Sequence, residues 1–156
     1  MSPRSPLHHG TFSIERSFRA APDRSFAAWS DPELKANWFA GPPESWTLIE
    51  RKLDFRVGGT EILHGRFLAG SSLFVAHYFV IEPEQLIVYA YDMHVSSKHL
   101  STSLASVEFA RTSQGGTRMK YTEQAAFLEG GAEDLRSREI GTLALLDRMG
   151  TLLGAA

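Results

Sequence analysis

The sequence predicts an α+β fold in which a curved antiparallel sheet of seven strands wraps around one long C-terminal helix. Three observations support this prediction: an alternating segment near the N-terminus, a region from Trp46 to Phe127 rich in β-branched and aromatic residues, and a final segment with helical periodicity. The 156 residues, of which 43% are hydrophobic, suit one globular domain. We therefore expect residues 12–156 to form a single domain, preceded by a flexible arm at 1–11.

The first predicted elements are one strand and two short helices. Residues 12–18 alternate in polarity, which is typical of a strand. Pro22 suits the first position of a helix, because no backbone N–H is needed there. Asp31 and Pro32 supply the cap and the first position of a second helix. The consecutive prolines at 42–43 then place a loop before the next strand.

Six further strands are predicted where turn signals rich in Gly, Ser and Pro recur at short intervals. We place these strands at residues 46–55, 59–67, 73–82, 86–95, 100–111 and 117–127. Connections this short between successive strands imply an antiparallel meander rather than crossover units.

The chain closes with one long helix that ends near Gly154. Its apolar face is formed by Leu135, Thr142, Leu145, Leu146, Met149 and Leu153. This helix is the only predicted element long enough to cover the sheet. The pattern leaves open whether the space between them is a pocket or is packed shut. Gly141 either allows close packing on the sheet, which we favour, or leaves room for a ligand.

Composition excludes several kinds of function. The chain has no cysteine, which rules out disulfides, thiolate nucleophiles and zinc sites with Cys ligands. Its formal net charge is −2, with 16 basic and 18 acidic residues scattered along it, so no basic face for nucleic acid or membrane is expected. No apolar run reaches the roughly 18–20 residues that span a bilayer, and the N-terminus lacks the apolar core of a signal peptide. We expect a cytoplasmic protein without a cofactor.

The glycine pair Gly58–Gly59 indicates a bend rather than a phosphate-binding loop. A phosphate loop leads into a helix and often carries a Lys, whereas this pair leads into a strand without one. Glu61 and His64 follow, but alternation places them on opposite faces of that strand. A local Glu–His catalytic pair is therefore disfavoured. Since no HxH or HExxH spacing occurs either, no metal site is expected.

The most informative candidate is Glu123. Alternation puts it on one face with Met119 and Tyr121, and we expect this face to point toward the helix. A buried carboxylate costs several kcal/mol unless it is paired or protonated. Glu123 therefore belongs to a structural network, is exposed at the rim, or serves a ligand or catalytic site, and we favour the first two. Its expected partners are His64, His77, His94 and Tyr91.

Two further groups are candidates for the pocket. His77 shares a face with Leu73, Val75 and Phe79, which indicates a hydrogen-bonded core residue more than a base. The aromatic residues are abundant and could line an apolar pocket, although any β-rich core contains such residues. The pair Trp38–Phe39 is the best candidate for the rim, because it ends the helical segment that closes the sheet.

Several segments resemble one known family in the right order along the chain. Residues 22–39 closely resemble the opening of the activator of heat-shock protein 90 ATPase homologue family. Residues 54–59, 80–93, 115–124 and 137–153 resemble its glycine pair, its strand–proline–strand turn, its penultimate strand and its closing helix. The family belongs to the START-like (SRPBCC) superfamily, and the resemblance implies the helix-grip fold.

The resemblance implies less about function, since the superfamily includes ligand carriers, hormone receptors, cyclases and co-chaperone domains. In the eukaryotic co-chaperone a separate N-terminal domain carries much of the chaperone contact. Only residues 1–11 precede the first strand here, so we do not transfer ATPase activation.

Three functional hypotheses follow. The leading one is a non-catalytic carrier that binds a small, mostly hydrophobic molecule between sheet and C-terminal helix. The residues expected to bind it are Trp38, Phe39, His64, His77, Tyr91, Tyr121, Glu123, Leu146 and Met149. The second is a cyclase- or hydrolase-type enzyme that uses Glu123 with a histidine or tyrosine. The third is a protein-interaction module, linked to the stress response, that acts on a chaperone or another protein through an exposed apolar patch. Such a patch could equally mark a homodimer.

Overall fold

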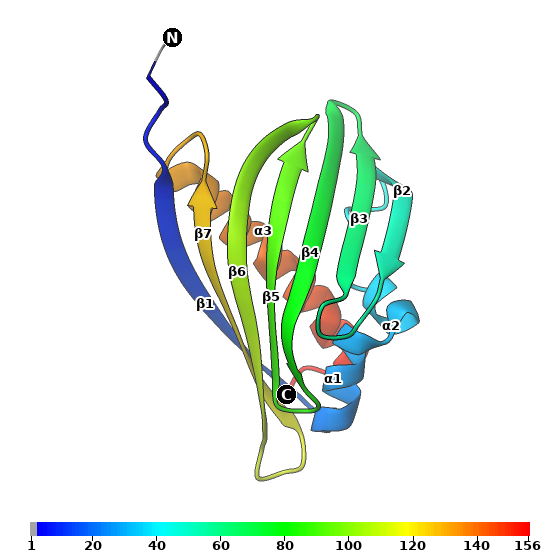
Figure 1. Cartoon of the computed structure of the whole chain (residues 1–156). Coiled ribbons are helices and arrows are strands. Elements are labelled where there is room, and N and C mark those ends of the chain that lie inside the picture. Colours follow the sequence, from blue (N-terminus) through cyan, green and yellow to red (C-terminus); the bar gives the residue numbers. More distant parts are fainter. Residues whose placement is uncertain (1–2) are drawn as a thin grey trace.

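The chain forms one seven-stranded antiparallel sheet that curves around a long C-terminal helix, as the computed structural model of residues 3–156 shows (Figure 1). The elements are β1 (His8–Phe18), α1 (Pro22–Ser30), α2 (Pro32–Ala36), β2 (Trp46–Leu53), β3 (Thr60–Phe67), β4 (Gly70–Glu82), β5 (Leu86–Val95), β6 (Lys98–Arg111), β7 (Thr117–Phe127) and α3 (Ala132–Leu153). The strand order is β1-β7-β6-β5-β4-β3-β2, so β2 to β7 form the predicted meander and β1 adds to its end. The predicted α+β fold class is confirmed.

The first strand starts earlier than predicted. His8 pairs with Phe127 of β7, and Gly10 pairs with Ala125, so the expected arm is wrong over 8–11. Cross-strand pairing to a distant segment extends β1 here, which no local pattern reveals. Residues 3–7 have no regular secondary structure, and the first two residues of the predicted arm lie outside the described residues.

The second helix is held at its start by the predicted cap. The Asp31 side chain accepts hydrogen bonds from the backbone N–H groups of Glu33 (2.9 Å) and Leu34 (3.4 Å). The helix ends at Ala36, and a turn carries the chain onward to the buried side chain of Trp38. The helix and its turn thereby place aromatic residues at one end of the sheet.

The glycine pair forms the turn into β3. Gly58 has a φ of +83°, a left-handed conformation that favours glycine, and its N–H donates to the carbonyl of Tyr78 (2.9 Å). Gly59 accepts a hydrogen bond from the Tyr78 N–H (3.1 Å). The pair thus joins the β3–β4 ladder rather than leading into a helix N-terminus, the arrangement that binds phosphate.

Replacing Gly59 by Ala should destabilise the protein by about 1–3 kcal/mol, because overpacking against fixed groups has that cost. A Cβ at this position would lie 2.1 Å from the Asp54 carbonyl oxygen, which belongs to the backbone and cannot move aside cheaply. Gly141→Ala is the matched control, since a Cβ there has no neighbour within 4 Å. Urea denaturation measures both, and equal stabilities for the two variants would contradict the clash.

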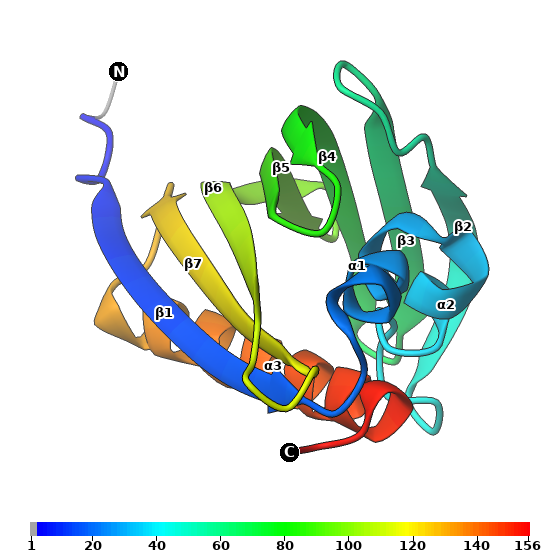
Figure 2. The ribbon, with the colours of Figure 1, turned by 90° about the horizontal axis from the view of Figure 1, so that it is seen from below.

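Helix α3 packs mainly against one end of the sheet. Helix α3 packs on β1 and β7, while β4 and β5 lie across from it and α1 and α2 cover one end (Figure 2). Register shifts at Leu48/Glu50, Tyr78/Val80 and Met93/His94 mark bulges, which increase the curvature of a sheet. The result is a space bounded by the central strands, the short helices and α3.

Candidate ligand-binding cavity

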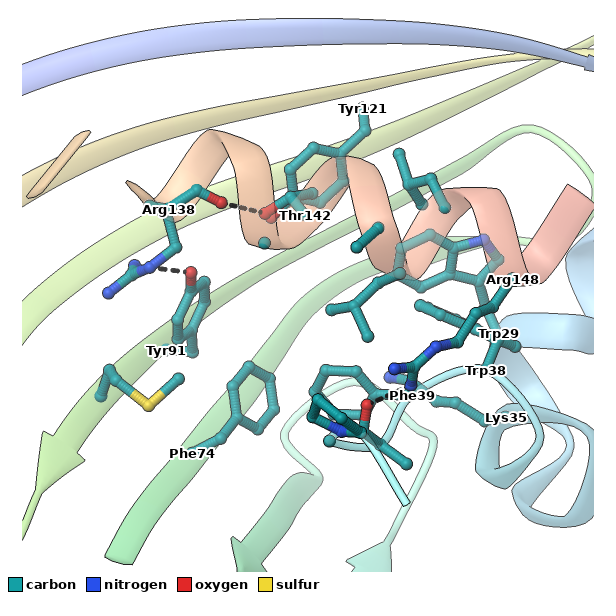
Figure 3. Close-up of a pocket in the computed structure, with 18 of the residues that line it drawn as sticks. Trp29, Lys35, Trp38, Phe39, Phe74, Tyr91, Tyr121, Arg138, Thr142 and Arg148 are labelled. Carbon is teal, nitrogen blue, oxygen red and sulfur yellow. Dashed lines mark hydrogen bonds between the residues drawn. The ribbon is translucent and has the colours of Figure 1, made fainter. Parts of the chain in front are cut away.

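A cavity of about 380 Å³ occupies the space between the central strands and α3. Figure 3 shows side chains from both short helices, the sheet and α3 converging on it. Its lining residues include Trp29, Lys35, Trp38, Phe39, Phe74, Tyr89, Tyr91, Met93, Tyr121, Arg138, Gly141, Thr142, Leu145, Leu146 and Arg148. The volume falls within the range of about 300–1,000 Å³ that is usual for small-molecule sites.

The wall of the cavity is aromatic. The alternation of β5 turns Tyr89, Tyr91 and Met93 inward, and Phe74 of β4 lies beside Tyr91 with ring centroids 4.8 Å apart. The turn after α2 adds Phe39, whose ring meets that of Phe74 edge-on at 4.9 Å. Such rings offer apolar surface with fixed geometry, which suits a flat or aliphatic guest.

Behind this wall lies Glu123, which faces inward as its alternation predicts and is 0% exposed. One carboxylate oxygen accepts from Tyr121 (2.6 Å), and the other accepts from Tyr91 (2.7 Å), Ser103 (2.7 Å) and Arg138 (3.0 Å). The ion pair with Arg138 compensates its charge. The carboxylate is thus fully partnered inside the structure, and two of its partners, Tyr91 and Tyr121, separate it from the cavity.

The histidines predicted to accompany Glu123 lie elsewhere. His64 is on the face of β3 opposite to Glu61, and His77 is exposed. Strand β4 is apolar on both faces, and its inner face is Phe74, Ala76 and Tyr78 rather than the face of His77. The prediction that these two histidines bind a ligand in the cavity is therefore wrong.

The remaining predicted residues divide into two groups. Trp38, Phe39, Tyr91, Tyr121 and Leu146 line the cavity. Met149 is fully buried in the hydrophobic core instead and is not part of the cavity lining. Glu123 is not part of the lining either, but it accepts hydrogen bonds from the lining residues Tyr91 and Tyr121. His94, the other expected partner of Glu123, stacks on His99 with ring centroids 4.5 Å apart.

A second buried polar cluster was not predicted. Lys35 of α2 is 2% exposed and donates to the Glu61 carboxylate (2.6 Å), which is itself 3% exposed. The hydroxyl of Tyr78 donates to the same carboxylate oxygen (2.6 Å). Burial lowers the pKa of Lys35, and the charge of Glu61 and its hydrogen bond partly offset this effect. A buried carboxylate needs a cationic partner. The position of Glu61 on the inner face of β3 could therefore have predicted that a lysine or arginine lies beside it.

The four tyrosines of the chain share one electrostatic property. They are Tyr78, Tyr89, Tyr91 and Tyr121, and all are buried. Burial, reinforced by the nearby carboxylates, raises the pKa of each hydroxyl well above its ordinary value of 10.0. They stay protonated at neutral pH, and Tyr78, Tyr91 and Tyr121 donate hydrogen bonds to buried carboxylates.

No metal centre or membrane span emerges from the described residues. Over 3–156 there is no group of three or more His, Cys, Asp or Glu side chains that could hold a metal ion. Within the same part of the chain, no helix has the length and apolar character to cross a membrane.

The curved sheet, the covering helix and the cavity between them define a helix-grip protein with an internal pocket. The chain belongs to the family described as activator of Hsp90 ATPase homolog 1-like protein, whose model matches residues 19–154. The family resemblance seen in the sequence is thereby confirmed. Among curated proteins, the comparison found no match.

Solved structures agree with this assignment. A protein from Rhizobium leguminosarum is 40% identical, with a TM-score of 0.88 and coverage of 97% of this chain and 98% of that one. The Mll3558 protein from Rhizobium loti is 34% identical, with a TM-score of 0.85 and coverage of 94% and 99%. CalU16 from Micromonospora echinospora shares the fold at 18% identity, with a TM-score of 0.64 and coverage of 97% and 85%.

Proposed function

We propose that this protein binds one small, mostly apolar molecule in the cavity between the sheet and α3, and carries or sequesters it without chemical change. The observation that carries the proposal is the aromatic lining of a cavity of about 380 Å³. A space of this size and character is typical of small-molecule sites, where apolar walls supply affinity and a few polar groups fix orientation.

The polar groups around the cavity support binding rather than catalysis. A general base needs a free lone pair within hydrogen-bond reach of the substrate. Both oxygens of Glu123 and Oε1 of Glu61 accept hydrogen bonds from internal donors, neither carboxylate lines the cavity, and neither predicted histidine reaches it. Among the described residues no predicted histidine pairs with Glu123, and the tyrosines that do, Tyr91 and Tyr121, have pKa values raised well above 10, which disfavours them as bases at neutral pH. Homodimer formation and contact with a partner protein remain predictions.

A large side chain at position 141 of the cavity lining should weaken ligand binding. Gly141 of α3 lines the cavity, and a Cβ there would have nothing within 4 Å, so our preferred interpretation of Gly141 as a close-packing residue was wrong. We expect Gly141→Phe to weaken binding of the uncharged fluorescent probe N-phenyl-1-naphthylamine at least about tenfold, because its ring would occupy space needed by the guest. Fluorescence titration measures the dissociation constant.

Gly141→Ala is the matched control for this experiment. It adds only one methyl group, should bind the probe like the wild type, and should gain up to about 1 kcal/mol of stability through helix propensity. Equal probe affinity in the wild type and Gly141→Phe, or no binding to the wild type, would contradict the proposed function.

A further inference from the structure

The ionisable groups that line the cavity are all basic or neutral. Lys35, Arg138 and Arg148 contribute to the lining, whereas no Asp or Glu does so within the described part of the chain. The tyrosines add no negative charge, because burial keeps their hydroxyls protonated at neutral pH. The cavity wall therefore carries only positive formal charges.

Two of these three charges are neutralised inside the protein. Lys35 pairs with Glu61 at 2.6 Å, and Arg138 pairs with Glu123 at 3.0 Å. Arg138 also donates to the hydroxyls of Tyr91 and Ser101, at 2.7 Å each, so its guanidinium is largely occupied. Each of these cations belongs to a closed network and has little capacity left for a guest.

Arg148 differs from both. Its half-buried guanidinium donates one hydrogen bond, to the carbonyl of Ala40, and forms no ion pair with any described residue. The neighbouring Asp147 pairs with Arg16 instead. A guanidinium has five N–H donors in a planar fork, so most of those of Arg148 are free of protein partners. Figure 3 shows the side chain reaching from α3 across the cavity toward the loop that follows Phe39.

We propose that the ligand is an amphipathic anion, with an apolar body against the aromatic wall and one anionic head group bound by Arg148. This inference rests on the proposed function and names the ligand class for the same cavity. An arginine fork matches a carboxylate or a phosphate geometrically, and the partly buried setting strengthens the interaction over that in water. The remaining cations are already paired, so one head group balances the charge of the cavity.

Two probes with almost the same skeleton test this inference. 8-Anilinonaphthalene-1-sulfonate carries an anionic group that N-phenyl-1-naphthylamine lacks. We expect Arg148→Gln to weaken sulfonate binding about tenfold or more, the scale of one charge-assisted hydrogen bond, and to leave the uncharged probe within about twofold. Arg148→Lys, which keeps the charge but lacks the planar fork, should restore only part of the sulfonate affinity.

Arg136→Gln is the matched control, because it removes one charge from an exposed position on the same helix outside the cavity lining. It should bind both probes like the wild type. If Arg148 only anchors the loop at Ala40, Arg148→Gln will change both affinities equally or neither, and this outcome would overturn the inference. Loss of sulfonate affinity in Arg136→Gln as large as in Arg148→Gln would overturn it too.

Competition then distinguishes the head groups. Decanoate and decyl phosphate should each displace the bound sulfonate from the wild type, and the stronger competitor identifies the preferred head group, whereas decanol should displace it poorly. Equal displacement by decanol would overturn the anionic class while leaving the cavity as an apolar site. Failure of the uncharged probe to bind, by contrast, contradicts the proposed function itself.

Discussion

Replacing Glu61 by Leu should lower the free energy of unfolding by about 3–5 kcal/mol, the cost of removing one partner from a buried ion pair. The Lys35 ammonium would be left in an apolar site, 2% exposed, among aromatic rings, with Tyr78 as its only remaining hydrogen-bond partner among residues 3–156. Lys35 could escape only by losing its proton, which also costs free energy at neutral pH. Urea denaturation followed by circular dichroism measures the change.

A double variant separates the ion pair from simple loss of packing. Adding Lys35→Met to Glu61→Leu removes both charges, and we expect most of the lost stability to return, because apolar replacements of buried pairs are often neutral or stabilising. Glu50→Leu is the matched control, since Glu50 forms an exposed pair with Lys52 at 3.2 Å and should matter by less than about 1 kcal/mol. If Glu61→Leu lowered the free energy of unfolding no more than Glu50→Leu does, the result would contradict a buried Lys35–Glu61 ion pair that excludes water.

The second large effect is expected at alkaline pH. The folded pKa of each of the four buried tyrosines lies above the unfolded value of about 10, so their stabilising contribution is complete below pH 10 and is lost as the pH rises above it. Each tyrosine that ionises only in the unfolded chain lowers the free energy of unfolding by about 1.4 kcal/mol per pH unit. Together the four give a slope of roughly 5–6 kcal/mol per pH unit.

Lys35 changes the free energy of unfolding in the opposite direction, and over a different pH range. Its folded pKa is lowered, so its contribution to stability rises with pH until its ordinary pKa of 10.5 and is constant above that value. The steep loss should therefore be clearest above about pH 10.5.

Alkaline titration with two probes checks this account. Tyrosinate absorbance and far-ultraviolet circular dichroism should change in one coincident step, because the tyrosines ionise only when the fold opens. A tyrosinate signal that appears well before unfolding, near the ordinary pKa of 10.0, would show that at least one hydroxyl is accessible in the folded state.

The order and type of the elements could be predicted because their signals are local. Asp31 and Pro32 mark the start of a helix by their own chemistry, and the Gly58–Gly59 turn follows from backbone geometry. The start of β1 could not be predicted this way, since His8 is in a strand only through its pairing with Phe127.

The site was harder to predict, because it depends on which face of each strand points inward. Alternation placed Glu123 correctly, as β7 is polar on one face and mixed on the other. It failed for His77, because β4 carries apolar residues on both faces and the pattern does not choose between them.

The cationic partners of the two buried carboxylates were not predicted from the sequence for a related reason. Arg138 compensates Glu123 and Lys35 compensates Glu61, but each lies on a helix whose rotation against the sheet is a tertiary property. Charged residues on helices are usually exposed, so only the requirement that a buried carboxylate be paired pointed toward these two cations.

A crystal structure of the wild-type protein grown with N-phenyl-1-naphthylamine tests the central claim most directly. The account predicts one probe molecule in the cavity, with its rings against Phe74 and Tyr91 and its edge beside Gly141. A probe bound only on the outer face of the sheet, with the cavity empty, would contradict a ligand-binding role for this space.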